Sequence, residues 1–172
     1  MGPRAEGFRR LSRYDRRAFE SFERSARRLG WKAATQNHEI GHRTIKDTLV
    51  HILNVHEIWL VAAAQDRWDE VLANPGRRPQ AVSSFADLGT YRRTVWRGTD
   101  RLLGSLTDRA LGRRVQVPWM PGRYSLADAF HQVSYEQAHH LGEVIAAYWQ
   151  QDRTPPQMMW IPLQTGERVS VA

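Results

Sequence analysis

The sequence of 172 residues contains no cysteine, and this absence excludes several kinds of chemistry. A chain without thiols forms no disulfide, holds no metal through thiolate and has no cysteine nucleophile. Long apolar runs are also missing, since the longest, Ile58 to Ala64, is far shorter than the roughly 20 residues of a membrane-spanning helix. No apolar segment follows the basic residues at the N-terminus, so we expect no secretory signal and a cytoplasmic protein without a membrane partner.

Acidic residues are outnumbered, with 18 Asp and Glu against 25 Lys and Arg, which gives a net charge of +7. Nine of the arginines fall within the first 28 residues. Excess basic charge suits a nucleic-acid partner. Here, however, Asp15, Glu20 and Glu23 are interspersed and no nucleic-acid-binding motif accompanies the arginines. The pattern therefore favours the solvated face of an amphipathic helix, and we do not expect nucleic-acid binding.

Hydrophobic periodicity predicts four long helices, over about residues 4–29, 44–66, 84–107 and 125–150. The last three share one start signal, a Ser or Thr followed three residues later by Asp, at Thr44 and Asp47, Ser84 and Asp87, and Ser125 and Asp128. Such a hydroxyl accepts a hydrogen bond from a free amide of the first turn, and the acid can return one. Hydrophobic residues make up 41% of the chain, enough for one core. The sequence predicts a single all-α domain over residues 1–172, a four-helix bundle.

The segments between the helices carry turn signals. Pro and Gly in residues 73–83 predict a loop, and residues 113–125 are typical of a short extended stretch followed by a turn. Pro155 and Pro156 prevent the last helix from continuing, which leaves an irregular C-terminal tail. The apolar residues Met158 to Ile161 predict that this tail packs on the body of the domain.

The last helix carries two adjacent histidines that helical phase separates. At about 100° per residue, His140 falls in or beside the apolar face, whereas His139 falls on the polar side. Glu136 lies one turn before His140 on the same side. A glutamate that faces a core is costly unless it is paired or bound to a metal, so Glu136 and His140 are candidate metal ligands. A buried His–Glu hydrogen bond and a position of Glu136 at the solvent boundary are the alternatives.

The second helix and the loop before it hold four more histidines. Phase places His56 near the middle of the apolar stripe and His51 at its edge, where a bundle helix still faces a neighbour. Either one can also be a core histidine with a single polar partner. His38 and His42 lie in the loop, and we expect both at the surface.

The second helix, TIKDTLVHILNVHEIWL, is followed about 80 residues later by YSLADAFHQVSYEQAHHLGEV. Together these segments resemble the DinB/YfiT-like metalloprotein superfamily, over nearly the whole chain. The resemblance implies a four-helix bundle with a divalent metal, and it assigns the ligands to His51, Glu136 and His140. Glu136 stands where many members have a histidine, as in the variant of the mycothiol-dependent maleylpyruvate isomerase branch. His56 would then lie near the site as a candidate catalytic residue.

Two imidazoles and a carboxylate suit Zn²⁺ first, and also Ni²⁺, Fe²⁺ or Mn²⁺. Three protein ligands leave a coordination position open, which is typical of a catalytic site. The resemblance therefore implies a transferase or isomerase that uses a low-molecular-weight thiol on a small-molecule substrate, and it is compatible with a homodimer. A metal-dependent hydrolase and a stress-response protein that binds metal or ligand without turnover are alternatives. Before the last helix, Arg113, Arg114 and Arg123 either meet an anionic substrate or are solvated loop charges.

Overall fold

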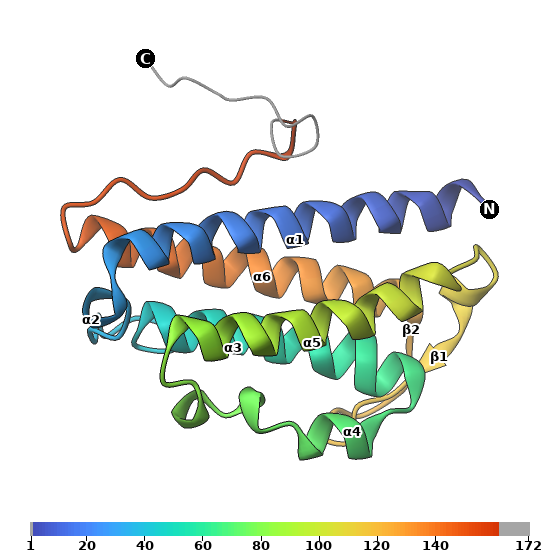
Figure 1. The fold of residues 1–172 in the computed structure, drawn as a ribbon. Coiled ribbons are helices and arrows are strands. Elements are labelled where there is room, and N and C mark those ends of the chain that lie inside the picture. Colours follow the sequence, from blue (N-terminus) through green and yellow to red (C-terminus); the bar gives the residue numbers. More distant parts are fainter. Residues whose placement is uncertain (1, 162–172) are drawn as a thin grey trace.

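The structure of the protein is a computed structural model, which describes residues 2–161. Its α-helices are α1 (Pro3–Leu29), α2 (Trp31–Ala34), α3 (Ile45–His56), α4 (Trp68–Ala73), α5 (Phe85–Gly104) and α6 (Leu126–Trp149). A π-helical segment, Glu57–Ala63, extends α3. The four long elements of Figure 1 are α1, α3 with its extension, α5 and α6. The predicted all-α fold is confirmed.

The three predicted helix starts are confirmed by their hydrogen bonds. Thr44, Ser84 and Ser125 each accept a hydrogen bond from the backbone N–H of the Asp three residues later. At the start of α6, the Asp128 carboxylate also accepts from the backbone N–H of Ser125 at 2.9 Å, which completes a capping box. The caps satisfy amides that a first helical turn leaves free. They thereby set where each of these helices begins.

The second long helix changes from α to π winding after His56, which the periodicity of residues 44–66 does not reveal. The carboxylate of Glu57 is buried and accepts hydrogen bonds from the Tyr91 hydroxyl and the Asn74 amide, both at 2.8 Å. Gly98 of α5 packs against this segment so closely that a Cβ there would lie 2.6 Å from a methyl carbon of Val61. Glycine at this position therefore lets α5 approach the π-helical turn.

The connectors largely follow the sequence-based expectations. The predicted loop contains two 3₁₀ turns, Pro75–Arg77 and Pro79–Ala81, while the short helix α4 before it has no clear signal in the sequence. In the segment before α6, β1 (Arg114–Val115) pairs antiparallel with β2 (Tyr124–Ser125). The predicted extended stretch and turn are thus a small hairpin.

The C-terminal tail runs back along α1 (Figure 1). The Tyr14 hydroxyl donates to the carbonyl of Met158 at 3.4 Å, and the rings of Tyr14 and Trp160 lie 4.9 Å apart between centroids. Met158 also packs against the core. The prediction that the tail packs on the domain is confirmed for Met158 and Trp160, whereas Met159 and Ile161 are exposed. Residues 162–172 lie outside the described part of the chain.

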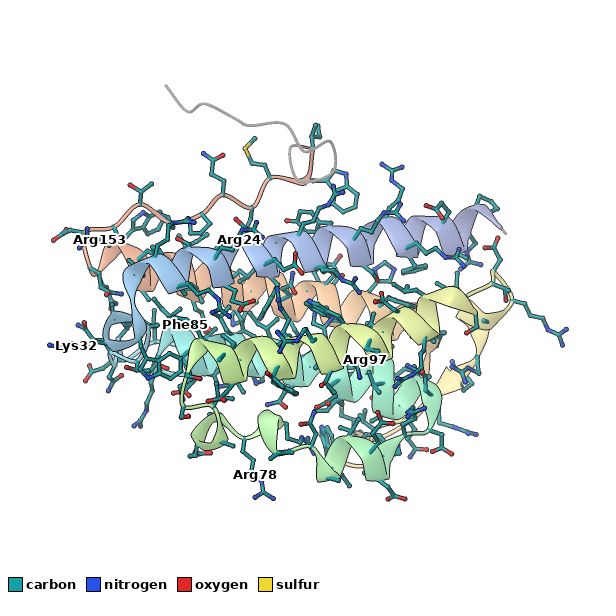
Figure 2. The ribbon with its side chains drawn as sticks, viewed as in Figure 1. Arg24, Lys32, Arg78, Phe85, Arg97 and Arg153 are labelled. Carbon is teal, nitrogen blue, oxygen red and sulfur yellow. The ribbon has the colours of Figure 1, made fainter. Side chains whose placement is uncertain are left out.

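Buried apolar side chains fill the bundle in two large clusters, which include Phe19, Phe22 and Leu53 in one and Leu60, Leu126 and Phe130 in the other. Most charged side chains lie at the surface, as Lys32, Arg78 and Arg153 do in Figure 2, whereas Asp15, Glu23 and Glu57 are buried. Some arginines bridge helices, as where Arg16 on α1 contacts Asp100 on α5 at 2.5 Å. Within residues 2–161, no helix combines the length and apolar character needed to cross a membrane.

Candidate metal centre

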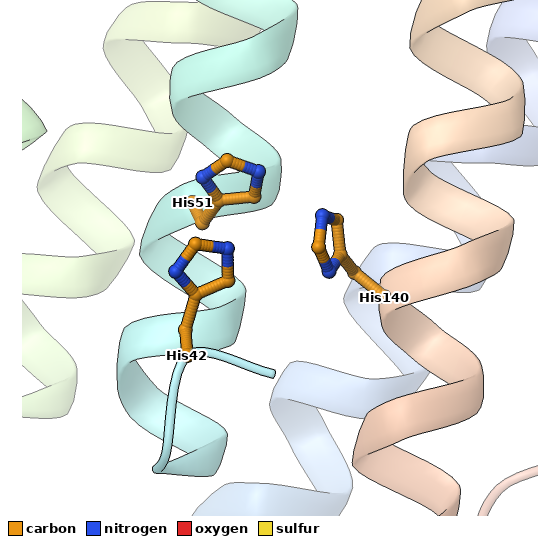
Figure 3. A group of neighbouring side chains, drawn as sticks. All are labelled: His42, His51 and His140. Carbon is orange, nitrogen blue, oxygen red and sulfur yellow. The ribbon is translucent and has the colours of Figure 1, made fainter. Parts of the chain in front are cut away.

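Three histidines from separate segments meet inside the bundle. His51 comes from α3, His140 from α6 and His42 from the loop before α3 (Figure 3). One ring nitrogen of each lies within 4.8 Å of those of the other two. The rings of His42 and His51 are stacked, 3.8 Å apart between centroids, while His140 stands edge-on to His51 at 4.5 Å. The three rings can therefore direct nitrogen atoms at one ion.

The loop before α3 reaches the site because alternate residues point inward. His38 is buried, with its Nδ1 3.0 Å from the amide oxygen of Gln150 at the end of α6. Ile40 packs against the core, and His42 follows two residues later. Arg43 has a φ of 70°, a left-handed conformation that is uncommon for residues other than glycine. The prediction that both histidines lie at the surface is thus wrong for His38, which is buried. It holds only in part for His42, which is half-buried.

Burial favours neutral imidazoles at this centre. Desolvation, reinforced by the neighbouring His42 and His140, lowers the pKa of His51 to about 4. Desolvation is also the main cause that lowers the pKa of His42. A neutral imidazole offers the lone pair that a metal requires. Near pH 7, His42 and His51 are therefore in the protonation state of metal ligands.

Glu143 orients the third histidine. Its Oε2 lies 2.7 Å from Nδ1 of His140. A carboxylate accepts a hydrogen bond from this nitrogen, and the tautomer that donates it carries its lone pair on Nε2. Gly41 of the loop passes directly over this carboxylate, and a Cβ at that position would overlap it. The loop and the orienting glutamate are therefore packed on each other.

Glu136, the predicted carboxylate ligand, lies beside His140. Its Oε2 is 3.3 Å from Nε2 of His140, and its Oε1 accepts a hydrogen bond from Gln132 at 2.9 Å. The Glu136 side chain is 35% exposed, so the fully inward position on this turn belongs to its neighbour Gln137. Two ligands of one metal with bonds of about 2 Å lie roughly 3 Å apart, so this carboxylate is close enough to join an ion bound by His140. In the described residues, however, there are two groups of three mutually close donors, His42 with His51 and His140, and His139 with His140 and Glu143, and neither contains Glu136.

Comparison with protein-family models identifies the family of the chain. The model of the DinB superfamily matches residues 14–144, about three quarters of the sequence. The chain belongs to the DinB superfamily. A comparison with curated proteins gave no match. The part matched to the DinB superfamily contains His42, His51 and His140, so the whole candidate metal centre lies inside it.

The other two histidines considered for the site of this DinB-superfamily protein have different surroundings. The His139 side chain is 69% exposed and points outward as predicted. His56 is buried, with its Nε2 2.9 Å from the amide oxygen of Gln137 and its ring edge-on to Trp96. Gln137 in turn donates to the backbone carbonyl of Asp15 at 2.8 Å. His56 therefore belongs to a polar chain that joins α3, α6 and α1, and the structure does not bring it into the group of three histidines.

Proposed function

We propose that this DinB-superfamily protein is a metal-dependent enzyme in which His42, His51 and His140 bind a divalent ion. The observation that carries the proposal is the convergence of their ring nitrogens, within 4.8 Å of one another, from three segments of the fold. Imidazole donors favour Zn²⁺ first, and they also suit Ni²⁺, Fe²⁺ or Mn²⁺. Glu136 is proposed as an additional donor, because its carboxylate adjoins Nε2 of His140.

The surroundings of the three rings fit an ion. The lowered pKa values of His42 and His51 keep their lone pairs free at neutral pH. The hydrogen bond from Nδ1 of His140 to Glu143 has the form that commonly orients a metal-binding histidine. These features support a site that is held in shape before the ion arrives.

A divalent ion in this site supplies Lewis acidity, which lowers the pKa of a water or thiol that binds to it. The protein's own residues provide the setting for that chemistry. Glu143 keeps a proton on Nδ1 of His140, and Gln132 holds one oxygen of Glu136 so that the other faces Nε2 of His140.

For the reaction, we propose transfer or isomerisation of a small molecule with a low-molecular-weight thiol as cofactor. The membership of the DinB superfamily supports this choice, as does Glu136, which resembles the His–Glu–His variant of the thiol-dependent branch. A thiol is also a strong nucleophile once it is ionised. His56 takes no part in this reaction, because its ring is buried against Gln137 and Trp96.

The test is a turnover assay of zinc-loaded protein on small electrophilic substrates, with and without mycothiol or bacillithiol. Turnover that requires the thiol and disappears in His51→Ala supports the proposal. Hydrolysis that needs no thiol would instead identify a metal-dependent hydrolase. Stoichiometric metal without turnover in either assay would indicate a binding protein, such as a stress-response protein, and would contradict the proposed enzyme.

A further inference from the structure

A cavity of about 550 Å³ lies beside the β1–β2 hairpin, and its lining includes Arg113, Arg114 and Arg123. It is remote from the metal centre. The backbone N–H of Leu126, the first residue of α6, donates to the carbonyl of Arg113 at 2.8 Å. His140 follows Leu126 by fourteen residues, which is about 21 Å of α-helix. The cavity is therefore a separate feature of the molecule.

The hairpin gathers the arginines. In its register Arg114 lies opposite Ser125 and Val115 opposite Tyr124, so continuing the register places Gln116 opposite Arg123. Residues opposite each other in an antiparallel pair share a face, as do residues two apart on one strand. Arg114, Gln116 and Arg123 thus share one face, and all three line the cavity. A guanidinium nitrogen of Arg113 donates to the carbonyl of Ala64, which holds a third positive charge at the same cavity.

The three guanidinium groups lack acidic partners. Among residues 2–161, none of them forms an ion pair, whereas Arg16 and Arg92 pair with carboxylates of other helices. Asp128 is attracted to Arg114, but its carboxylate is engaged in the cap of α6. Asp66 is the single acidic residue among those that line the cavity. Three like charges against one opposite charge favour a ligand with more than one negative charge.

We propose that this cavity binds a small organic phosphate. The planar fork of arginine matches phosphate oxygens and forms paired hydrogen bonds with them. A volume of about 550 Å³ lies within the range of small-molecule sites. Gln116 and Asp66 can bind hydroxyl groups of the same ligand, because amide and carboxylate oxygens accept hydrogen bonds from hydroxyls. The ligand class is therefore a phosphorylated, hydroxyl-bearing molecule such as a sugar phosphate.

Isothermal titration calorimetry of the full chain in physiological salt, with ribose 5-phosphate and inorganic pyrophosphate as probes, tests the proposal. We expect saturable binding of both probes. The double variant Arg114→Gln/Arg123→Gln should weaken it at least tenfold, since each lost hydrogen bond to a charged group has about that effect on affinity. Asp66→Asn should strengthen pyrophosphate binding, because it removes a negative charge that repels the ligand. The affinity for ribose 5-phosphate should fall relative to that for pyrophosphate, because a hydroxyl-binding carboxylate is lost.

The matched control is Arg78→Gln/Arg97→Gln, which removes the same charge from two exposed arginines away from the cavity (Figure 2). It should bind both probes as the wild type does. Equally weakened probe binding in the control would show that the effect comes from net charge alone, and it would overturn the proposal. An absence of probe binding to the wild type would overturn it as well. Because the site is independent of the metal, His51→Ala protein should bind the probes unchanged, whatever the outcome for the proposed enzyme.

Discussion

Oε2 of Glu143 lies 2.7 Å from Nδ1 of His140, one helical turn away on α6. This bond fixes the ring and its proton, so the nitrogen directed at the proposed ion depends on a residue that does not bind the ion itself. Loss of such a partner commonly weakens metal binding by about 10- to 100-fold.

Glu143→Ala should therefore weaken zinc binding by about 10- to 100-fold while leaving the stoichiometry intact. Competition with a chromogenic chelator measures the change. His139→Ala is the control, because His139 contacts the other oxygen of Glu143 at 3.4 Å but is exposed. Affinity equal to wild type in Glu143→Ala would show that the carboxylate does not position His140.

Asp15 should make stability depend on pH in a direction opposite to that of most carboxylates. Burial raises its pKa from an ordinary 3.8 to about 7, although the Ser134 hydroxyl donates to it at 2.6 Å. Between these values the folded chain holds a proton that the unfolded chain has released, so this group's contribution to stability falls as pH rises from about 4 to 7. The loss is about 1.4 kcal/mol per pKa unit.

Asp15→Asn removes this titration and keeps an acceptor for Ser134. Urea unfolding at pH 5 and pH 8 should show the variant gaining stability relative to wild type at the higher pH. If the free energy of unfolding changes equally with pH in both proteins, Asp15 does not hold a proton in the folded state.

His56→Ala should destabilise the fold rather than the metal site. The substitution leaves a cavity beside Trp96, and it removes the hydrogen-bond partner of the Gln137 amide oxygen. A buried polar group without a partner costs about 1–3 kcal/mol. Chemical denaturation measures the loss, and zinc affinity of the folded protein should stay at the wild-type value. A stable His56→Ala protein that loses its activity would restore the catalytic role first considered for this residue.

Gly98→Ala should also destabilise the bundle, by about 1–3 kcal/mol, because the added Cβ would press on Val61 in the π-helical segment. Gly7→Ala is the matched change on α1, where no atom beyond the adjacent helix backbone lies within 4 Å of an added Cβ. There alanine should stabilise the helix by about 0.5–1 kcal/mol. Thermal unfolding of both variants checks the contrast, and equal effects would contradict the close packing at Gly98.

The sequence predicts best those features that local chemistry determines. The caps at Thr44, Ser84 and Ser125 depend on residues three apart, so their helix starts are legible from the sequence alone. The contrast between buried His140 and exposed His139 follows from helical phase. Helical phase is less reliable for a residue at the edge of the apolar face. Successive residues are about 100° apart, so a small rotation of the helix decides which of two neighbours is buried. That is why the structure buries Gln137 where Glu136 was expected.

Features that depend on the backbone conformation of loops cannot be predicted from the sequence in this way. His42 reaches the centre through a loop in which Glu39 and Arg43 have positive φ values of 56° and 70°, and neither residue type signals such a turn. The α-to-π transition after His56 likewise leaves no mark in hydrophobic spacing. The histidine that completes the candidate centre was therefore visible only once the chain was folded.

The proposed centre has His42 as its third histidine ligand and Glu136 as an additional donor, whereas the sequence assigned the third position to Glu136. Substitution of the two residues separates these ligand sets. Zinc content after exhaustive dialysis of wild type, His42→Ala, His51→Ala, His140→Ala, His139→Ala and Glu136→Gln is the most direct measurement. Three histidine ligands predict equimolar zinc in wild type and His139→Ala, reduced affinity but retained zinc in Glu136→Gln, and loss of zinc in the other three. Full zinc in His42→Ala together with its loss in Glu136→Gln would contradict this centre and support His51, Glu136 and His140 instead.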